Sequence, residues 1–113
     1  MSIYNPDKWV IVKITALDNP PIYKVFACWY GGYAGSDSWK LNSGITQVSR
    51  DGYVYSFEGA SGSTYECHTD CYGTNFYGQG VLSNMIDNSA KHGHTVEILP
   101  EDTDWEQIDY GID

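Results

Sequence analysis

The residue types best suited to chemistry are cysteine and histidine, and several of them lie close together in the sequence. Cys67, His68 and Cys71 form one group. His92 and His94 follow about two dozen residues later. Zinc takes thiolate and imidazole ligands in a tetrahedral arrangement, so a zinc-stabilised module that uses Cys67, Cys71 and histidines is one alternative. The spacing is irregular, however, and histidines at a helix end are equally explained by the helix dipole. We therefore predict no metal site and no cofactor.

A catalytic cysteine would need a base within reach and an electropositive surrounding that lowers the pKa of its thiol. The chain carries a net charge of -9, which favours a raised thiol pKa instead. The sequence also contains no Gly-x-Ser-x-Gly motif, no His-Glu-x-x-His motif and no phosphate-binding glycine-rich loop. We predict that the protein is not an enzyme.

The end of the chain carries most of the negative charge. Residues 101–113 contain six carboxylates and no basic side chain, which accounts for -6 of the net charge of -9. The same block contains large apolar side chains that a purely solvating tail does not need, namely Trp105, Ile108, Tyr110 and Ile112. The alternative is a tail that is disordered or lightly docked and serves solubility.

Closely spaced carboxylates can imitate the phosphates of nucleic acid and compete for the basic groove of a nucleic-acid-binding protein. Trp105 and Tyr110 would then supply the buried anchors of the interface. This pattern favours a non-enzymatic binding protein with a basic protein partner. Direct contact with nucleic acid is not expected, because the chain and the phosphates are both negatively charged.

A second aromatic group surrounds a pair of glycines, Gly31 and Gly32. Trp29 and Trp39 are expected to pack into the core, whereas Tyr30 and Tyr33 are candidates for contact with a partner. A small-molecule or glycan-binding β domain that uses these tyrosines is a further alternative. The predicted partner-binding residues are Glu101, Asp102, Asp104, Trp105, Glu106, Asp109, Tyr110, Tyr30 and Tyr33.

The elements that position these residues follow from the hydrophobic pattern. Residues 1–100 predict a single α+β domain in which one amphipathic helix packs on an antiparallel meander of about five to six strands. In the β-branched stretch 9–17, Val10, Val12 and Ile14 share one face. Asp51-Gly52 predicts a hairpin. Further strands are predicted at residues 22–30, 53–57, 63–69 and 95–99, with one or two weakly marked strands between 39 and 50, and the helix at residues 75–91.

Length and composition indicate how many domains the chain forms and in which cellular compartment it works. The 113 residues allow one domain, to which residues 101–113 add an acidic C-terminal segment. We expect no transmembrane helix or membrane partner, because no apolar run reaches 18 residues. The start of the chain lacks a signal peptide pattern, and the three cysteines favour free thiols in a reducing cytoplasm. The sequence leaves open a Cys67–Cys71 disulfide and a homo-oligomer formed through an exposed strand edge.

Two stretches of the sequence carry a likeness to a known class of proteins, residues 23–45 (YKVFACWYGGYAGSDSWKLNSGI) and residues 96–105 (VEILPEDTDW). Through them the chain resembles, in overall style and over most of its length, the small, acidic, aromatic-rich accessory proteins of tailed bacteriophages. The resemblance implies an inhibitor or modulator of a host or defence system that binds stoichiometrically in the bacterial host cytoplasm. Anti-CRISPR and anti-restriction proteins belong to that class. The resemblance transfers no catalytic or binding residue.

Overall fold

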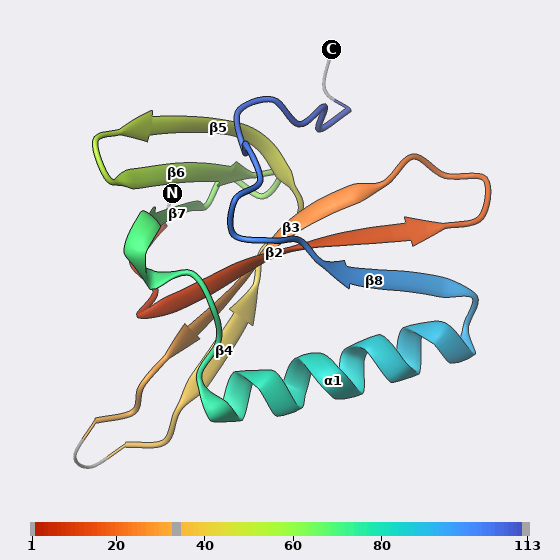
Figure 1. The fold of residues 1–113 in the computed structure, drawn as a ribbon, viewed down its shortest axis with the longest axis horizontal. Helices are drawn as coiled ribbons and strands as arrows, with labels where there is room; N and C mark the ends of the chain where they lie inside the picture. The colour runs from red at the N-terminus through yellow and green to blue at the C-terminus, as the bar shows by residue number, and fades with distance from the viewer. Residues whose placement is uncertain (1, 33–34, 112–113) are drawn as a thin grey trace.

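The structure, a computed structural model, describes residues 2–32 and 35–111. Tyr33, Ile112 and Asp113 lie outside the described residues. Within these ranges the chain forms strands, one short 3-10 helix and one α-helix (Figure 1). In chain order they are β1 (Ile3–Tyr4), β2 (Lys8–Ala16), β3 (Ile22–Trp29), β4 (Ser38–Leu41), β5 (Ile45–Asp51), β6 (Val54–Gly59), β7 (Thr64–His68), η1 (Thr69–Cys71), α1 (Phe76–Lys91) and β8 (His94–Ile98).

The strands form two four-stranded sheets, with the orders β4-β3-β2-β8 and β1-β7-β6-β5. The short β1 runs parallel to β7, and the other strand pairs are antiparallel. The predicted α+β class is confirmed, but the expected single meander is divided between two sheets. The division falls between β4 and β5, where Gly44 has a φ of 133° that favours glycine and the chain leaves the first sheet.

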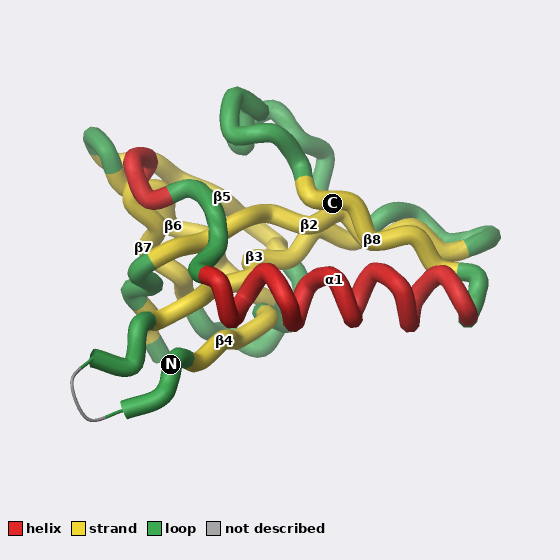
Figure 2. Tube along the Cα trace, turned by 60° about the horizontal axis from the view of Figure 1, so that its bottom comes forward, coloured by secondary structure: helices red, strands yellow, loops and turns green. Residues whose placement is uncertain are grey.

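The two long central strands are covered on both faces, which gives the molecule three layers. Val10 and Val12 of β2 pack toward α1, in a core cluster that also contains Leu82. Trp9 and Ile11 of the same strand pack toward the second sheet. The predicted alternation along β2 is therefore confirmed. Figure 2 shows α1 along one side of the β4-β3-β2-β8 sheet and the C-terminal loop on the other side.

The helix has the limits and the capping residues that its sequence predicts. Asn75 precedes its first residue, and the Asn75 side-chain oxygen accepts a hydrogen bond of 2.7 Å from the Gly78 backbone N–H. Gly78 also lets the helix approach β3, because a Cβ at this position would lie 2.4 Å from Cys28 Sγ. Gly93 follows the helix with a φ of 78°, as a helix-ending glycine does. In the described part of the chain, no helix is long and apolar enough to cross a membrane.

The hairpin predicted at Asp51-Gly52 is confirmed between β5 and β6. Asp51 pairs with Val54, and Gly52 takes the first position of the two-residue loop with a φ of 61°. This hairpin matters for the site described below, because it carries Arg50 and Tyr55.

Candidate functional site

The acidic C-terminal segment is folded onto the body of the protein. After β8, the backbone N–H of Leu99 donates to the carbonyl oxygen of Ile11. The carbonyl oxygen of Pro100 then accepts hydrogen bonds from the backbone N–H and the hydroxyl of Thr103, at 3.1 and 2.6 Å. These bonds close a turn that directs the next residues over the core cluster between the two sheets.

Two further turns are fixed by carboxylates of the segment itself. The Asp104 carboxylate accepts a 3.2 Å hydrogen bond from the backbone N–H of Glu106. The Asp109 carboxylate accepts one of 2.9 Å from the backbone N–H of Gly111. Aspartate is well suited to such turns, because its short side chain can accept from a backbone donor two residues ahead.

Trp105 anchors the segment in the hydrophobic core. Its side chain is 2% exposed and belongs to the cluster that fills the space between the two sheets. The Trp105 ring stacks on Tyr72, with centroids 5.6 Å apart, and packs edge-to-face against Trp9 at 5.9 Å. Burial of an indole of this size contributes several kcal/mol to folding.

Tyr110 forms a second, smaller anchor. Its hydroxyl donates a hydrogen bond of 2.5 Å to the Trp105 carbonyl oxygen, and its ring packs edge-to-face on Tyr23. Burial raises the pKa of Tyr110 above its ordinary value, which keeps the phenol protonated and able to donate.

The carboxylates lie on the opposite side of this arrangement from the anchors. Each acidic residue between positions 101 and 109 is exposed, while Trp105 is buried and Ile108 and Tyr110 are partly buried. The segment therefore presents a row of negative charges on a backbone that is fixed from beneath. The exposed acidic residues are Glu101, Asp102, Asp104, Glu106 and Asp109.

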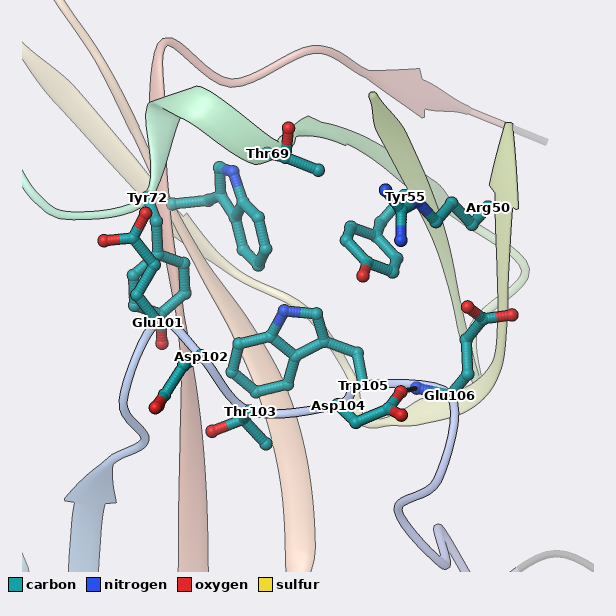
Figure 3. Close-up of a pocket in the computed structure, with 11 residues that line it drawn as sticks. Arg50, Tyr55, Thr69, Tyr72, Glu101, Asp102, Thr103, Asp104, Trp105 and Glu106 are labelled. Atoms are coloured by element: carbon teal, nitrogen blue, oxygen red, sulfur yellow. Dashed lines mark hydrogen bonds between the residues drawn. The ribbon is translucent and has the colours of Figure 1, made fainter. Parts of the chain in front are cut away.

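The segment also closes one side of a pocket of about 720 Å³ (Figure 3). Aromatic rings form its inner wall, and the exposed carboxylates stand around its rim. The lining residues are Trp9, Arg50, Tyr55, Thr69, Tyr72, Glu101, Asp102, Thr103, Asp104, Trp105 and Glu106. Polar and charged side chains therefore make up most of the lining, over an aromatic inner wall.

One basic side chain faces this pocket. The guanidinium carbon of Arg50 lies 5.4 Å from the centre of the Tyr55 ring, a cation–π arrangement. The Arg50 Nε donates a 2.9 Å hydrogen bond to the carbonyl oxygen of Gly52 in the hairpin loop. Figure 3 shows the Glu106 carboxylate on the same side of the pocket as Arg50.

Tyr72 holds the inner wall in place. Its hydroxyl donates to the carbonyl oxygen of Leu99 at 2.6 Å and accepts from the backbone N–H of Ile11 at 3.1 Å. Burial raises the pKa of Tyr72 to about 12, a shift to which the nearby Glu101 adds. No pattern in the sequence indicates the roles of Tyr72, Trp9 and Arg50, because their elements meet only in the folded chain.

The predicted aromatic-glycine loop lies away from this pocket. Tyr30 is 56% exposed, and its backbone N–H donates to the Asp7 carboxylate. Trp29 is half-buried, and its indole N–H donates to the carbonyl oxygen of Asn5. Trp39 is less buried than expected, but it stacks on Phe26 with centroids 5.4 Å apart. Tyr30 is therefore not brought together with the acidic residues of the C-terminal segment.

The cysteines and histidines do not assemble into a metal site in the described part of the chain, where no group of three potential ligands is placed to hold a metal ion. Cys67 is buried between the sheets, and Cys71 is half-buried at the end of η1. His92 follows the last residue of α1, and His94 is the first residue of β8. All three cysteines are free thiols. The structure thus offers no support for the zinc-module alternative.

The comparisons with known proteins add no relative. The chain matches no protein-family model, no curated protein and no solved structure.

Proposed function

We propose that the protein is a non-enzymatic inhibitor or modulator that binds a basic protein partner through its acidic C-terminal segment. The observation that supports this function best is the buried Trp105 within a row of exposed carboxylates. A flexible acidic tail would lose conformational freedom on binding, and that loss would weaken the complex. A segment that the Trp105 indole already holds in place loses less conformational freedom on binding, so the complex is weakened less.

Electrostatics support a basic partner. The segment holds carboxylates that face solvent, and complementary charge accelerates association and selects the partner. A nucleic-acid-binding protein offers a groove that is adapted to rows of negative charge. The partner we propose is therefore a nucleic-acid-binding enzyme, with the acidic segment occupying the groove in place of nucleic acid.

The surroundings of the thiols favour binding over catalysis. Burial raises the pKa of the Cys28 and Cys67 thiols, and burial together with the Asp70 carboxylate raises that of Cys71. A nucleophilic cysteine needs the opposite shift. A binding protein needs no reactive thiol.

The resemblance to phage accessory proteins supports a more specific version of the proposal. Such proteins modulate host or defence systems by stoichiometric binding. On this basis the partner is a defence nuclease or another host nucleic-acid enzyme in the bacterial cytoplasm, and the protein acts in the manner of an anti-CRISPR or anti-restriction protein.

Two variants test the role of the carboxylates. The neutralised variant carries Glu101→Gln, Asp102→Asn, Asp104→Asn and Glu106→Gln. The matched control carries Asp18→Asn, Glu58→Gln, Asp87→Asn and Glu97→Gln, which are exposed carboxylates outside the segment. Each set changes the net charge from -9 to -5, so the two differ only in where the charge is removed. Asparagine at position 104 keeps the oxygen that accepts from the Glu106 backbone N–H.

The experiment is capture from a bacterial lysate at about 0.05 M and about 0.5 M salt, between which the screening length falls about threefold. The expected result is capture of a basic nucleic-acid-binding protein that duplex DNA displaces. Capture should weaken at high salt and with the neutralised variant, and should persist with the matched control. A captured partner that is indifferent to salt, to DNA and to the neutralised variant would overturn the proposal.

A further inference from the structure

The pocket beneath the acidic segment combines two features that the row of carboxylates alone does not explain. Its inner wall is aromatic, contributed by β2, β6, the residues after η1 and the segment itself, and its volume is about 720 Å³. A row of charges that meets a flat basic surface would not need a concave aromatic floor. The pocket is therefore a candidate binding site.

A hydrogen-bond donor on a buried side chain points into this pocket. Trp105 is 98% buried, and Figure 3 shows its indole nitrogen directed toward the space bordered by Thr69 and Tyr55. In the described part of the chain this N–H has no hydrogen-bond acceptor, whereas the indole N–H of Trp9 donates to the carbonyl oxygen of His68 at 2.6 Å. The nitrogen itself is accessible from the pocket, since among the described residues the fully buried side-chain polar atom without a partner is Asn42 Nδ2. The free donor is therefore suited to an acceptor oxygen brought by a ligand.

The rim of the pocket is suited to a cation. Four carboxylates stand around it, against one basic side chain, Arg50. That side chain also shows which cation the wall accommodates, since its guanidinium lies over the Tyr55 ring. A guanidinium is flat, stacks on aromatic faces and pairs with carboxylates through two parallel hydrogen bonds. An ammonium group has neither the flat shape nor the paired donors.

We propose that this pocket binds an arginine residue of the partner protein. The arginine guanidinium pairs with the rim carboxylates beside the aromatic wall, and its main-chain carbonyl oxygen accepts from Trp105 Nε1. The inference rests on the proposed function in one respect, that the arginine belongs to a protein partner. It adds the position and the chemical identity of the group that the partner inserts.

The test uses the full chain and the probe N-acetyl-arginine amide, which carries the guanidinium and two carbonyl oxygens of a peptide. Binding is followed through the Trp105 indole N–H signal in a nitrogen-proton NMR spectrum. The signal is assigned with the Trp105→Phe variant, or through contacts with the Trp9 and Tyr72 rings if that variant does not fold. The expected result is a saturable shift of this signal with a Kd on the order of 1 mM, as the size of the probe implies.

Variants and related probes distinguish the contribution of the rim carboxylates from that of the aromatic wall. The neutralised variant should weaken binding at least about fivefold, and the matched control should not. Arg50→Gln should strengthen binding about two- to fivefold, because it removes the resident cation and frees the Tyr55 ring. N-acetyl-citrulline amide, which has the same shape without the charge, should give no saturable shift. N-acetyl-lysine amide should bind at least about threefold more weakly.

The inference is overturned if the arginine probe gives no saturable shift up to about 50 mM, if the citrulline probe binds equally well, or if the neutralised variant binds unchanged. Free arginine that binds at least tenfold more tightly than the amide would assign the site to a small molecule and overturn the partner residue. These outcomes are independent of the lysate capture, so a failed pocket and a failed proposed function are distinguishable.

Discussion

The Trp105 indole packs edge-to-face against Trp9, with ring centroids 5.9 Å apart and an angle of 62° between the ring planes. Trp9 lies near the start of the chain and Trp105 near its end, and both are almost fully buried. The contact makes the acidic segment part of the hydrophobic core. Removal of the segment would therefore disturb the fold as well as the charge, and charge neutralisation is the cleaner test of function.

Replacement of the anchor should destabilise the whole protein. We expect Trp105→Ala to lower the free energy of unfolding by about 3–5 kcal/mol, because it removes a buried indole from contact with Trp9 and Tyr72. Urea denaturation followed by circular dichroism measures the change. Tyr53→Ala removes an aromatic ring that is 77% exposed and should cost no more than about 0.5 kcal/mol. Equal losses for the two variants would mean that Trp105 is not a core residue.

The hydroxyl of Tyr72 should stabilise the wall of the pocket. Tyr72→Phe keeps the ring but leaves the backbone N–H of the buried Ile11 without its acceptor and the carbonyl oxygen of Leu99 without its donor. We expect a loss of about 1–3 kcal/mol in the free energy of unfolding. Hydrogen exchange at the Ile11 amide should accelerate in the same variant. Unchanged stability and exchange would contradict the hydrogen-bonded role of this hydroxyl.

Stability should fall at alkaline pH. Burial raises the pKa of Tyr65 and of Tyr72 to about 12, whereas a tyrosine in the unfolded chain titrates near about 10. The folded state therefore binds these protons more tightly, and the stability they contribute is complete below pH 10 and is lost as the pH rises toward 12. Urea midpoints measured across this interval should decrease, and less steeply for Tyr72→Phe. A flat profile would contradict the raised pKa values.

The thiols should differ in reactivity. Cys28 and Cys67 are buried, and Cys71 is partly exposed. Of these three free cysteines, we expect Cys71 to react with a thiol reagent in the native state, slowly because its pKa is raised, and all three to react in denaturant. Mass spectrometry of the labelled protein identifies the sites. Rapid labelling of Cys67 in the native state would contradict its place between the sheets.

Local patterns in the sequence predicted much of the secondary structure. The period-two alternation in β2, the Asp51-Gly52 hairpin and the Asn75 and Gly93 helix ends depend on neighbouring residues, so they can be recognised without the fold. The division into two sheets could not be predicted. It depends on the turn at Gly44 and on the burial of both faces of β2 and β3, which is a property of the assembled layers.

The candidate site shows the same limit. The acidic residues 101–106 were predicted from charge alone. Trp105 was predicted as a contact for a partner, whereas the structure buries it in the protein's own core. Arg50, Tyr55 and Tyr72 reach the pocket from the hairpin of the second sheet and from the connection before α1. No spacing in the sequence relates these residues to Trp105, because tertiary packing alone brings them together.

Calorimetry at low and at high salt tests whether the folded acidic segment binds the partner. It compares the affinity of the captured partner for the neutralised variant with that for the matched control. Neutralisation should weaken binding at least about tenfold at low salt and remove most of the salt dependence, while the matched control stays within about twofold of the unmodified protein. Equal affinities for the two variants would contradict the claim that the folded acidic segment binds the partner.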